Sequence, residues 1–218
     1  MTSLQTVIHQ NQQTIAFIEA KDYYSAIVSS SSALECLGSI PLILQRQENS
    51  SCSSPSEEET ALDQCMLHTT IQENDDICGT QTFMYSHAIP LPHNVTDYAI
   101  ITLVLIFNAA LAHHLVAMQD KENSPRFLFR AKQLYTLAYH SQDVEHNPLF
   151  LFVVYNNAAL IDLQQIGDKD SWNACVGHLV SIYMVMMDEG YTSQVRHLHG
   201  FLESLLATSM PARPPAAA

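Results

Sequence analysis

Apolar residues recur at helical spacing along most of the chain. Near the start, Ile8, Ile15 and Ile18 fall on one face of a helix over residues 4–20. Residues 99–107 are apolar almost without a break, which is typical of a helix buried on most of its circumference. This pattern, read with its breaks, predicts an all-α protein of seven helices.

The breaks between these helices carry residues that favour helix ends. Ser124 precedes Pro125 and Asn147 precedes Pro148, so each pair places an N-cap oxygen before a proline at the first helical position. A proline is tolerated there because its missing N–H has no partner in the helix. Gly190 is a natural C-terminal cap. We therefore expect helices to begin after residues 124 and 147, and one to end near residue 190.

Three stretches do not follow a helical pattern. Residues 49–64 are Ser-rich and acidic, and we expect a loop there because so little apolar surface can be buried. Residues 65–92 alternate apolar and polar positions around a polar run, which predicts a small β-hairpin ending at Pro90 and Pro92. Residues 210–218 are mostly Pro and Ala, and predict a disordered tail.

The helices come in similar pairs. The phrase at residues 107–111, Phe-Asn-Ala-Ala-Leu, matches Asn-Asn-Ala-Ala-Leu at residues 156–160, 49 positions later. The second helix of a pair carries a small residue, a residue four positions on and a small residue three further: Ala131, Tyr135 and Ala138 in one copy, and Ala26, Ser30 and Ala33 in another. A third copy has Ala174 but His178 where an aromatic residue is expected, followed by Met184, Met186 and Met187, which we expect to fill the core.

On these motifs the sequence resembles the tetratricopeptide-repeat superfamily over about three quarters of its length. It is similar also to uncharacterised repeat families of eukaryotic microalgae, on residues 105–115 and 85–92. The resemblance implies a right-handed α-solenoid of about three degenerate helix pairs plus a capping helix, with the hairpin as an insertion. The single domain, 1–218, would comprise helix pairs over 1–48, 97–145 and 147–190 and a capping helix over 192–209.

The resemblance also implies a concave groove, lined by the first helix of each pair, that holds a peptide or a partner helix. Two groove positions, Asn108 and Asn157, are equivalent. Their amides offer a donor and an acceptor at once, so they would either bond to a bound peptide backbone or satisfy neighbouring backbone or water. The positions carried over are Val104, Phe107, Asn108, Leu111, His114, Val153, Asn156, Asn157, Leu160 and Gln164.

Some relatives in that superfamily hold the C-terminal carboxylate of a partner with Lys and Arg on this surface. The matching positions here are Asn11, Ile15, Asn108, Val153 and Asn157, none of which is cationic. A buried carboxylate without a charge partner is strongly disfavoured. We therefore expect no C-terminal carboxylate clamp.

Charge is sparse and unevenly distributed. Only 14% of the 218 residues are charged, yet the net charge is −13, and residues 1–97 hold two cations against twelve anions. This balance argues against nucleic acid and anionic membranes, which need clustered Lys and Arg. We expect a protein or peptide partner that is basic and meets the N-terminal half. Ser54 and Ser56 precede an acidic run, so phosphorylation there is a hypothesis.

Spacing argues against metal or catalytic chemistry. Among the histidines, His199 with Glu203, four positions on, has the spacing of two metal ligands on one helix face. No glycine-rich phosphate loop or nucleophile-elbow motif is present. We therefore expect no catalytic residue, metal or cofactor, and an interaction or scaffold module that is not an enzyme. The alternative is a small-ligand or metal-binding helical enzyme that uses the groove His and Asn residues.

The same residues bear on location. The five cysteines form no Cys-x-x-Cys pair, and residues 1–13 lack the apolar core of a signal peptide. Residues 99–118 would be flagged by hydropathy, but Asn108, His113 and His114 interrupt them. We expect a buried helix there, no membrane, and a soluble intracellular protein of the cytoplasm or nucleus. A membrane anchor over residues 99–118 is the alternative.

Overall fold

The computed structural model describes residues 4–39, 84–141, 147–165, 169–188 and 190, and these residues form six helices and no strand. The all-α prediction is therefore confirmed for the described part of the chain. The helices are α1 (Leu4–Glu19), α2 (Tyr23–Gly38), α5 (Tyr98–Gln119), α6 (Ser124–Tyr139), α7 (Pro148–Gln165) and α8 (Lys169–Asp188). The predicted loop over 49–64, the capping helix over 192–209 and the tail over 210–218 lie outside the described residues.

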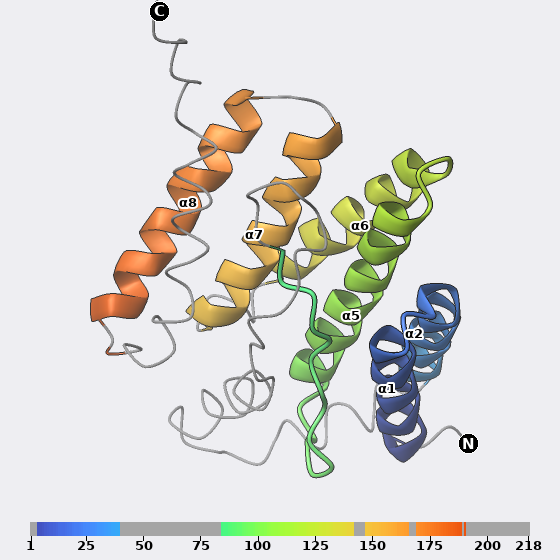
Figure 1. Cartoon of the computed structure of the whole chain (residues 1–218). Coiled ribbons are helices and arrows are strands. Elements are labelled where there is room, and N and C mark those ends of the chain that lie inside the picture. The colour runs from blue at the N-terminus through green and yellow to red at the C-terminus, as the bar shows by residue number, and fades with distance from the viewer. Residues whose placement is uncertain (1–3, 40–83, 142–146, 166–168, 189, 191–218) are drawn as a thin grey trace, which may run out of the picture.

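Each helix packs against the next one along the chain: α1 on α2, α2 on α5, α5 on α6, α6 on α7 and α7 on α8 (Figure 1). Helix α5 lies in the middle of this arrangement, between α2 and α6. The small residues predicted to permit close approach are buried in both α2 and α6. Ala26, Ala33, Ala131 and Ala138 have no exposed surface, and Ser30 has 1%.

The predicted helix ends are mostly correct. The side chain of Asn147 accepts a hydrogen bond from the Phe150 N–H at 2.9 Å, as an N-cap should. Gly190 has a φ of 83°, the left-handed conformation that glycine adopts readily after a helix. Helix α6 differs by one residue: it begins at Ser124, and Asn123 holds the cap position. Asn123 makes no side-chain cap bond, and its Nδ2 donates to the Asp120 carboxylate at 2.9 Å.

Helix α8 departs from the packing pattern of the other two copies. Ala174 and His178 are exposed, and the inward residues are Trp172, Leu179 and Met186, seven positions apart. These three large side chains belong to the hydrophobic core, while the ring of His178 stacks on the Tyr155 ring of α7 at 5.4 Å. Of the three methionines predicted to fill the core, only Met186 does. Met184 and Met187 are 56% and 41% exposed, so that prediction was wrong for them.

Helix α5 is the one helix in the described part of the chain that is long and apolar enough to cross a membrane. Its most apolar window is 83% buried inside the protein, so the prediction of a helix buried on most of its circumference is confirmed. Asp97 fixes its start by accepting a hydrogen bond from the Ala99 N–H at 2.7 Å.

Residues 84–97 cross from α7, run alongside α5 and turn back at residues 93–94 to enter it (Figure 1). The described part of the predicted hairpin, residues 84–92, is extended and pairs with no strand among the described residues. Pro90 and Pro92 contribute to this, since each lacks an N–H for a sheet and keeps the preceding residue extended. Residues 65–83 of the predicted hairpin lie outside the described part.

Candidate functional site

Three buried asparagines converge on residues 84–91, which we call the extended segment. Asn11 comes from α1, Asn108 from α5 and Asn157 from α7, the first helix of each pair. All three have no exposed surface. Because a buried amide is costly unless it is hydrogen-bonded, the partners of these side chains identify what the site holds.

Asn108 bonds to both backbone groups of Ile89. The Ile89 N–H donates to Asn108 Oδ1 at 2.8 Å, and Asn108 Nδ2 donates to the Ile89 carbonyl at 2.8 Å. Asn11 supports this pair from α1. Its Nδ2 donates to the same carbonyl at 3.3 Å, while Asn108 Nδ2 donates to Asn11 Oδ1 at 2.8 Å. Helices α1 and α5 therefore hold Ile89 through three hydrogen bonds to its backbone, and a fourth hydrogen bond joins the two asparagines.

Asn157 repeats this arrangement at Tyr85. The Tyr85 N–H donates to Asn157 Oδ1 at 3.0 Å, and Asn157 Nδ2 donates to the Tyr85 carbonyl at 2.9 Å. Asn157 Nδ2 also lies 3.1 Å from the hydroxyl oxygen of Tyr135 on α6. Complete burial raises the pKa of Tyr135, so its hydroxyl stays protonated and neutral. The hydrogen bond to Tyr135 thus fixes the orientation of the Asn157 amide toward the segment.

The spacing of these two pairs matches an extended chain. In such a chain, the N–H and the carbonyl of one residue point in the same direction, and residues an even number apart repeat that direction. Tyr85 and Ile89 are four apart and span about 13 Å at the usual rise per residue. One primary amide supplies the complementary donor and acceptor for each of them. The asparagines therefore bind backbone and make no demand on side-chain identity.

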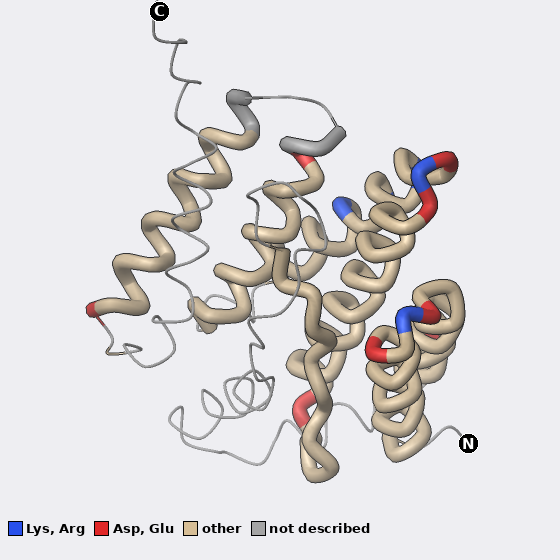
Figure 2. The backbone as a smooth tube through the Cα atoms, viewed as in Figure 1, with Lys and Arg blue, Asp and Glu red and all other residues tan. Residues whose placement is uncertain are grey.

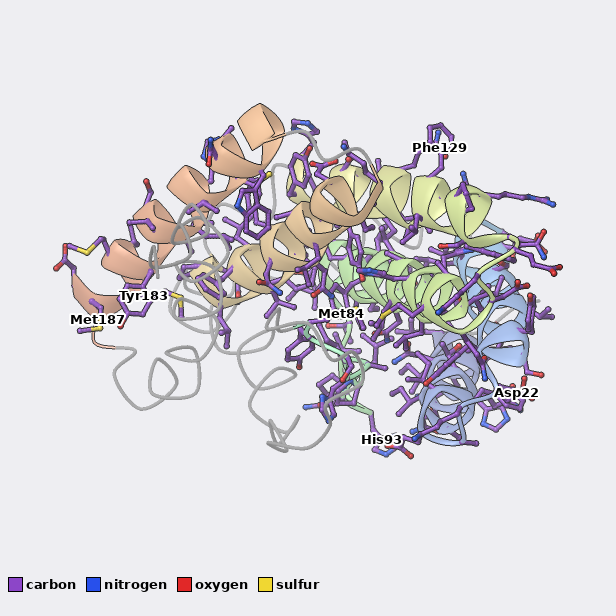
Figure 3. All side chains as sticks on the ribbon, turned by 45° about the horizontal axis from the view of Figure 1, so that its top comes forward. Asp22, Met84, His93, Phe129, Tyr183 and Met187 are labelled. Carbon is purple, nitrogen blue, oxygen red and sulfur yellow. The ribbon has the colours of Figure 1, made fainter. Side chains whose placement is uncertain are left out.

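Side chains of the extended segment also enter the protein. The Tyr85 side chain is buried, and its ring packs edge-on against Phe107 with centroids 6.0 Å apart. Phe107 in turn contacts the rings of Tyr135 and Phe150, at 5.9 and 5.8 Å. Ile89 has no exposed surface. In Figure 3, Met84 at the start of the segment lies among the helices, and His93, two residues past its end, lies at the edge of the molecule beside α1.

The charged residues in view in Figure 2 gather at helix ends and loops, and the helix faces carry few. One exception joins two helices: Lys132 on α6 forms an ion pair with Asp162 on α7, whose side chain is 5% exposed. Half-burial lowers the pKa of His87 in the extended segment, an effect that the carboxylate of Glu19 opposes.

The predicted groove residues are all interior where the structure describes them. Nine of the ten are at most 2% exposed, and the side chain of Gln164 lies outside the described part. Phe107, Asn108 and Asn157 contact the extended segment. The others fill the core or flank it: Val104, Leu111, Val153 and Leu160 in the hydrophobic core, His114 edge-on to Tyr135, and Asn156 beside Asn157, to which it donates at 3.3 Å.

The sequence pattern predicts neither the occupant of this site nor the part that Asn11 plays. Asn11 matches a carboxylate-clamp position of the tetratricopeptide superfamily but is not among the predicted groove residues. Asn11, Asn108 and Asn157 are equivalent, because each lies in the first helix of a pair. This equivalence indicates that all three bind the backbone of one and the same segment. Pro90 and Pro92 flank the extended chain that occupies the site, whereas the sequence pattern predicts them as the end of a hairpin.

Metal chemistry finds no support in the described part of the chain, where no three His, Cys, Asp or Glu side chains gather. The predicted pair His199 and Glu203 lies outside it. His113 is not suited to acid-base work at neutral pH. Burial, aided by the guanidinium groups of Arg130 and Arg126, lowers its pKa to about 4, and its ring packs against Phe127 at 5.9 Å.

Comparison with protein-family models, with curated proteins and with solved structures gives no match for this chain. What the site can do is therefore inferred from its own geometry. Three amides aligned across three helices bind an extended backbone, and an aromatic cluster receives one of its side chains.

Proposed function

We propose that this protein is an interaction module whose concave face binds an extended peptide of a partner protein. In this proposal the chain is a tetratricopeptide-like right-handed solenoid of about three helix pairs, and α1, α5 and α7 form the concave face. Two features support it: each helix packs on the next, and each first helix supplies one asparagine directed at the same extended chain.

The observation that carries the proposal is that one amide holds both backbone groups of one residue, and that this happens twice. The backbone hydrogen bonds of these two amides could form with any extended chain of the right length, because the N–H and carbonyl groups that they bind are common to all residues except proline. At present the chain's own extended segment fills the site. A partner peptide would therefore bind by replacing it.

The geometry favours an extended peptide over a partner helix. In a helix, the backbone N–H and carbonyl groups are used by each other, so an amide such as Asn108 finds no complete partner along a helical ligand. It favours binding over catalysis as well. The amides of Asn108 and Asn157 are committed to backbone hydrogen bonds, and His114 has no exposed surface.

The charge of the partner follows from the sequence around the site. Eight of the twelve anions in residues 1–97 fall in residues 40–83, immediately before the extended segment. A basic partner would be attracted to that stretch over a range of about 10 Å at moderate salt. Binding should then weaken as salt concentration rises. We place this activity inside the cell, in the cytoplasm or nucleus.

A direct test uses a fluorescent peptide with the sequence of residues 84–92, Met-Tyr-Ser-His-Ala-Ile-Pro-Leu-Pro. The receptor is the full chain with Tyr85→Ala and Ile89→Ala, which weakens its own segment. We expect fluorescence anisotropy to show saturable binding, and wild type to bind at least about 10-fold more weakly because its site is filled.

Two further variants of the same receptor control this test. Adding Asn108→Ala and Asn157→Ala should abolish binding, whereas adding Ser30→Ala should leave it unchanged. Ser30 is equally buried, but its hydroxyl bonds within its own helix, to the Ile27 carbonyl at 3.0 Å. Hydrogen exchange at residues 85 and 89 reports whether the segment has been released. No binding to a folded receptor with a released segment would refute the proposed function.

A further inference from the structure

We infer that the site selects its peptide by sequence as well as by backbone: an aromatic residue, an aliphatic residue four positions later, and a second aliphatic residue two positions beyond that. The inference deepens the proposed function and rests on it. The template is the chain's own Tyr85, Ile89 and Leu91, which lie in the order that a partner peptide would copy.

The register of such a peptide is fixed at two points. Asn157 holds residue 85 and Asn108 holds residue 89, in each case by both backbone groups. A shift by one residue would turn these backbone groups away from the amides and turn every side chain to the opposite face. The site therefore dictates which positions of the peptide face the protein.

Three apolar side chains of the segment are the most deeply buried. Tyr85, Ile89 and Leu91 are 2%, 0% and 4% exposed, whereas His87, which alternation places on the same face, is only half-buried. Ser86 and His87, between the two anchored residues, are both partly exposed. We therefore expect the first three positions to be selective and these two to tolerate substitution.

The aromatic position has the most specific surroundings. The Tyr85 ring meets the Phe107 ring at an interplanar angle of 60°, the edge-on geometry that aromatic pairs favour. Phe107 is itself held by Tyr135 and Phe150. An alanine here would leave the edge of a fixed aromatic cluster without a partner, and the cluster cannot collapse to close the gap.

Three other features bear on which peptide sequences can bind. Ala88 is 7% exposed, so the residue before the aliphatic anchor must be small. Proline is accepted at the next position, since Pro90 stands there in the template, and it keeps the anchor extended. The three side chains that bind the segment's backbone, Asn11, Asn108 and Asn157, are uncharged. The peptide therefore needs no terminal or side-chain carboxylate in this stretch.

The experiment is a substitution series in the peptide of residues 84–92, measured against the receptor with Tyr85→Ala and Ile89→Ala. Alanine in place of Tyr85 or Ile89 in the peptide should weaken binding at least about 10-fold. Alanine in place of Ser86 or His87 should change it by less than about 3-fold. A peptide of reversed sequence should bind at least about 10-fold more weakly, because in the backbone direction that Asn157 and Asn108 accept it presents its aromatic and aliphatic side chains in the wrong order.

The outcomes separate the two claims. If the parent peptide binds through Asn108 and Asn157 while all substituted peptides bind equally well, the sequence selection is wrong and the proposed function stands. If the parent peptide does not bind a receptor whose segment is released, the proposed function itself fails.

Should that receptor not fold, the same series is read within the intact chain. Tyr85→Ala and Ile89→Ala, made singly, should each speed hydrogen exchange at amides 85 and 89 at least about 10-fold, while Ser86→Ala and His87→Ala leave it within about 3-fold. Equal effects at all four positions would overturn the inference.

Discussion

Replacing Asn108 by alanine is the most direct perturbation of the asparagine site. The change removes three hydrogen bonds, each 2.8 Å long: two to Ile89 and one to Asn11. The Ile89 carbonyl keeps its longer bond from Asn11 at 3.3 Å. The Ile89 N–H and Asn11 Oδ1 lose their partners in a region from which water is excluded.

The expected cost follows from those two groups. A buried polar group that loses its hydrogen-bond partner costs about 1–3 kcal/mol, so the pair costs roughly 2–6 kcal/mol. We therefore expect the free energy of unfolding to fall by about 2–6 kcal/mol, against about 5–15 kcal/mol for a typical domain. The control Ser30→Ala should cost about 1 kcal/mol or less, since it removes one hydroxyl that bonds within its own helix.

Urea unfolding followed by circular dichroism measures both values, and a double-mutant cycle with Asn11→Ala tests the linkage between the asparagines. Because Asn11 and Asn108 share a hydrogen bond and a common carbonyl, the double variant should lose about 0.5–3 kcal/mol less than the sum of the single variants. Strict additivity, or a loss from Asn108→Ala no larger than that from Ser30→Ala, would show that the described bonds do not hold the segment.

Three other changes test the surroundings of the site. Tyr135→Phe should lower stability by about 0.5–1.5 kcal/mol in urea unfolding and change peptide binding by less than about 3-fold, since Asn157 keeps both bonds to its backbone partner. Lys132→Ala should cost about 1–3 kcal/mol, discounted for the partial exposure of the lysine, and adding Asp162→Asn should recover much of it. His113 binds a proton in the folded state only below pH about 4 but in the unfolded state below its ordinary 6.5. Stability should therefore fall as pH decreases from 6.5 to 4, by about 1–2 kcal/mol after allowing for solvent screening, and His113→Gln should remove that part of the pH dependence.

Much of the fold could be predicted because its determinants are local. The helix that begins at Pro148 has its N-cap in the adjacent Asn147, and the burial of Ala131 and Ala138 follows from their spacing on one helix. The pattern failed in α8, where Trp172 and Met186 face inward and Ala174 does not. Which face of that helix packs against α7 depends on side chains of another helix, and spacing along α8 alone does not contain that information.

The site was predictable in part for a related reason. The equivalence of Asn108 and Asn157 is visible in the repeated phrase, and so is the capacity of an amide to bind backbone. The occupant is not visible, because Tyr85 and Asn157 are 72 residues apart in sequence. An alternating run favours extended chain whether its partner is a second strand or a row of side-chain amides. The hairpin prediction treats Ile89 to Pro92 as the end of a strand pair, whereas the structure bonds the backbone of Ile89 to Asn108.

An occupied site changes what an affinity measurement means. The extended segment is joined to α5 through a few residues, so its effective concentration at the site is that of a tethered ligand, about millimolar for short flexible connections. A free peptide competes with that concentration, and its apparent Kd is the intrinsic Kd divided by the fraction of molecules with an open site. If one molecule in a hundred is open, a partner with a micromolar intrinsic Kd binds at about 100 micromolar. Partners of the wild-type protein must therefore either match the anchors at Tyr85 and Ile89 more closely than the segment does, or gain additional contacts beyond those with the three asparagines.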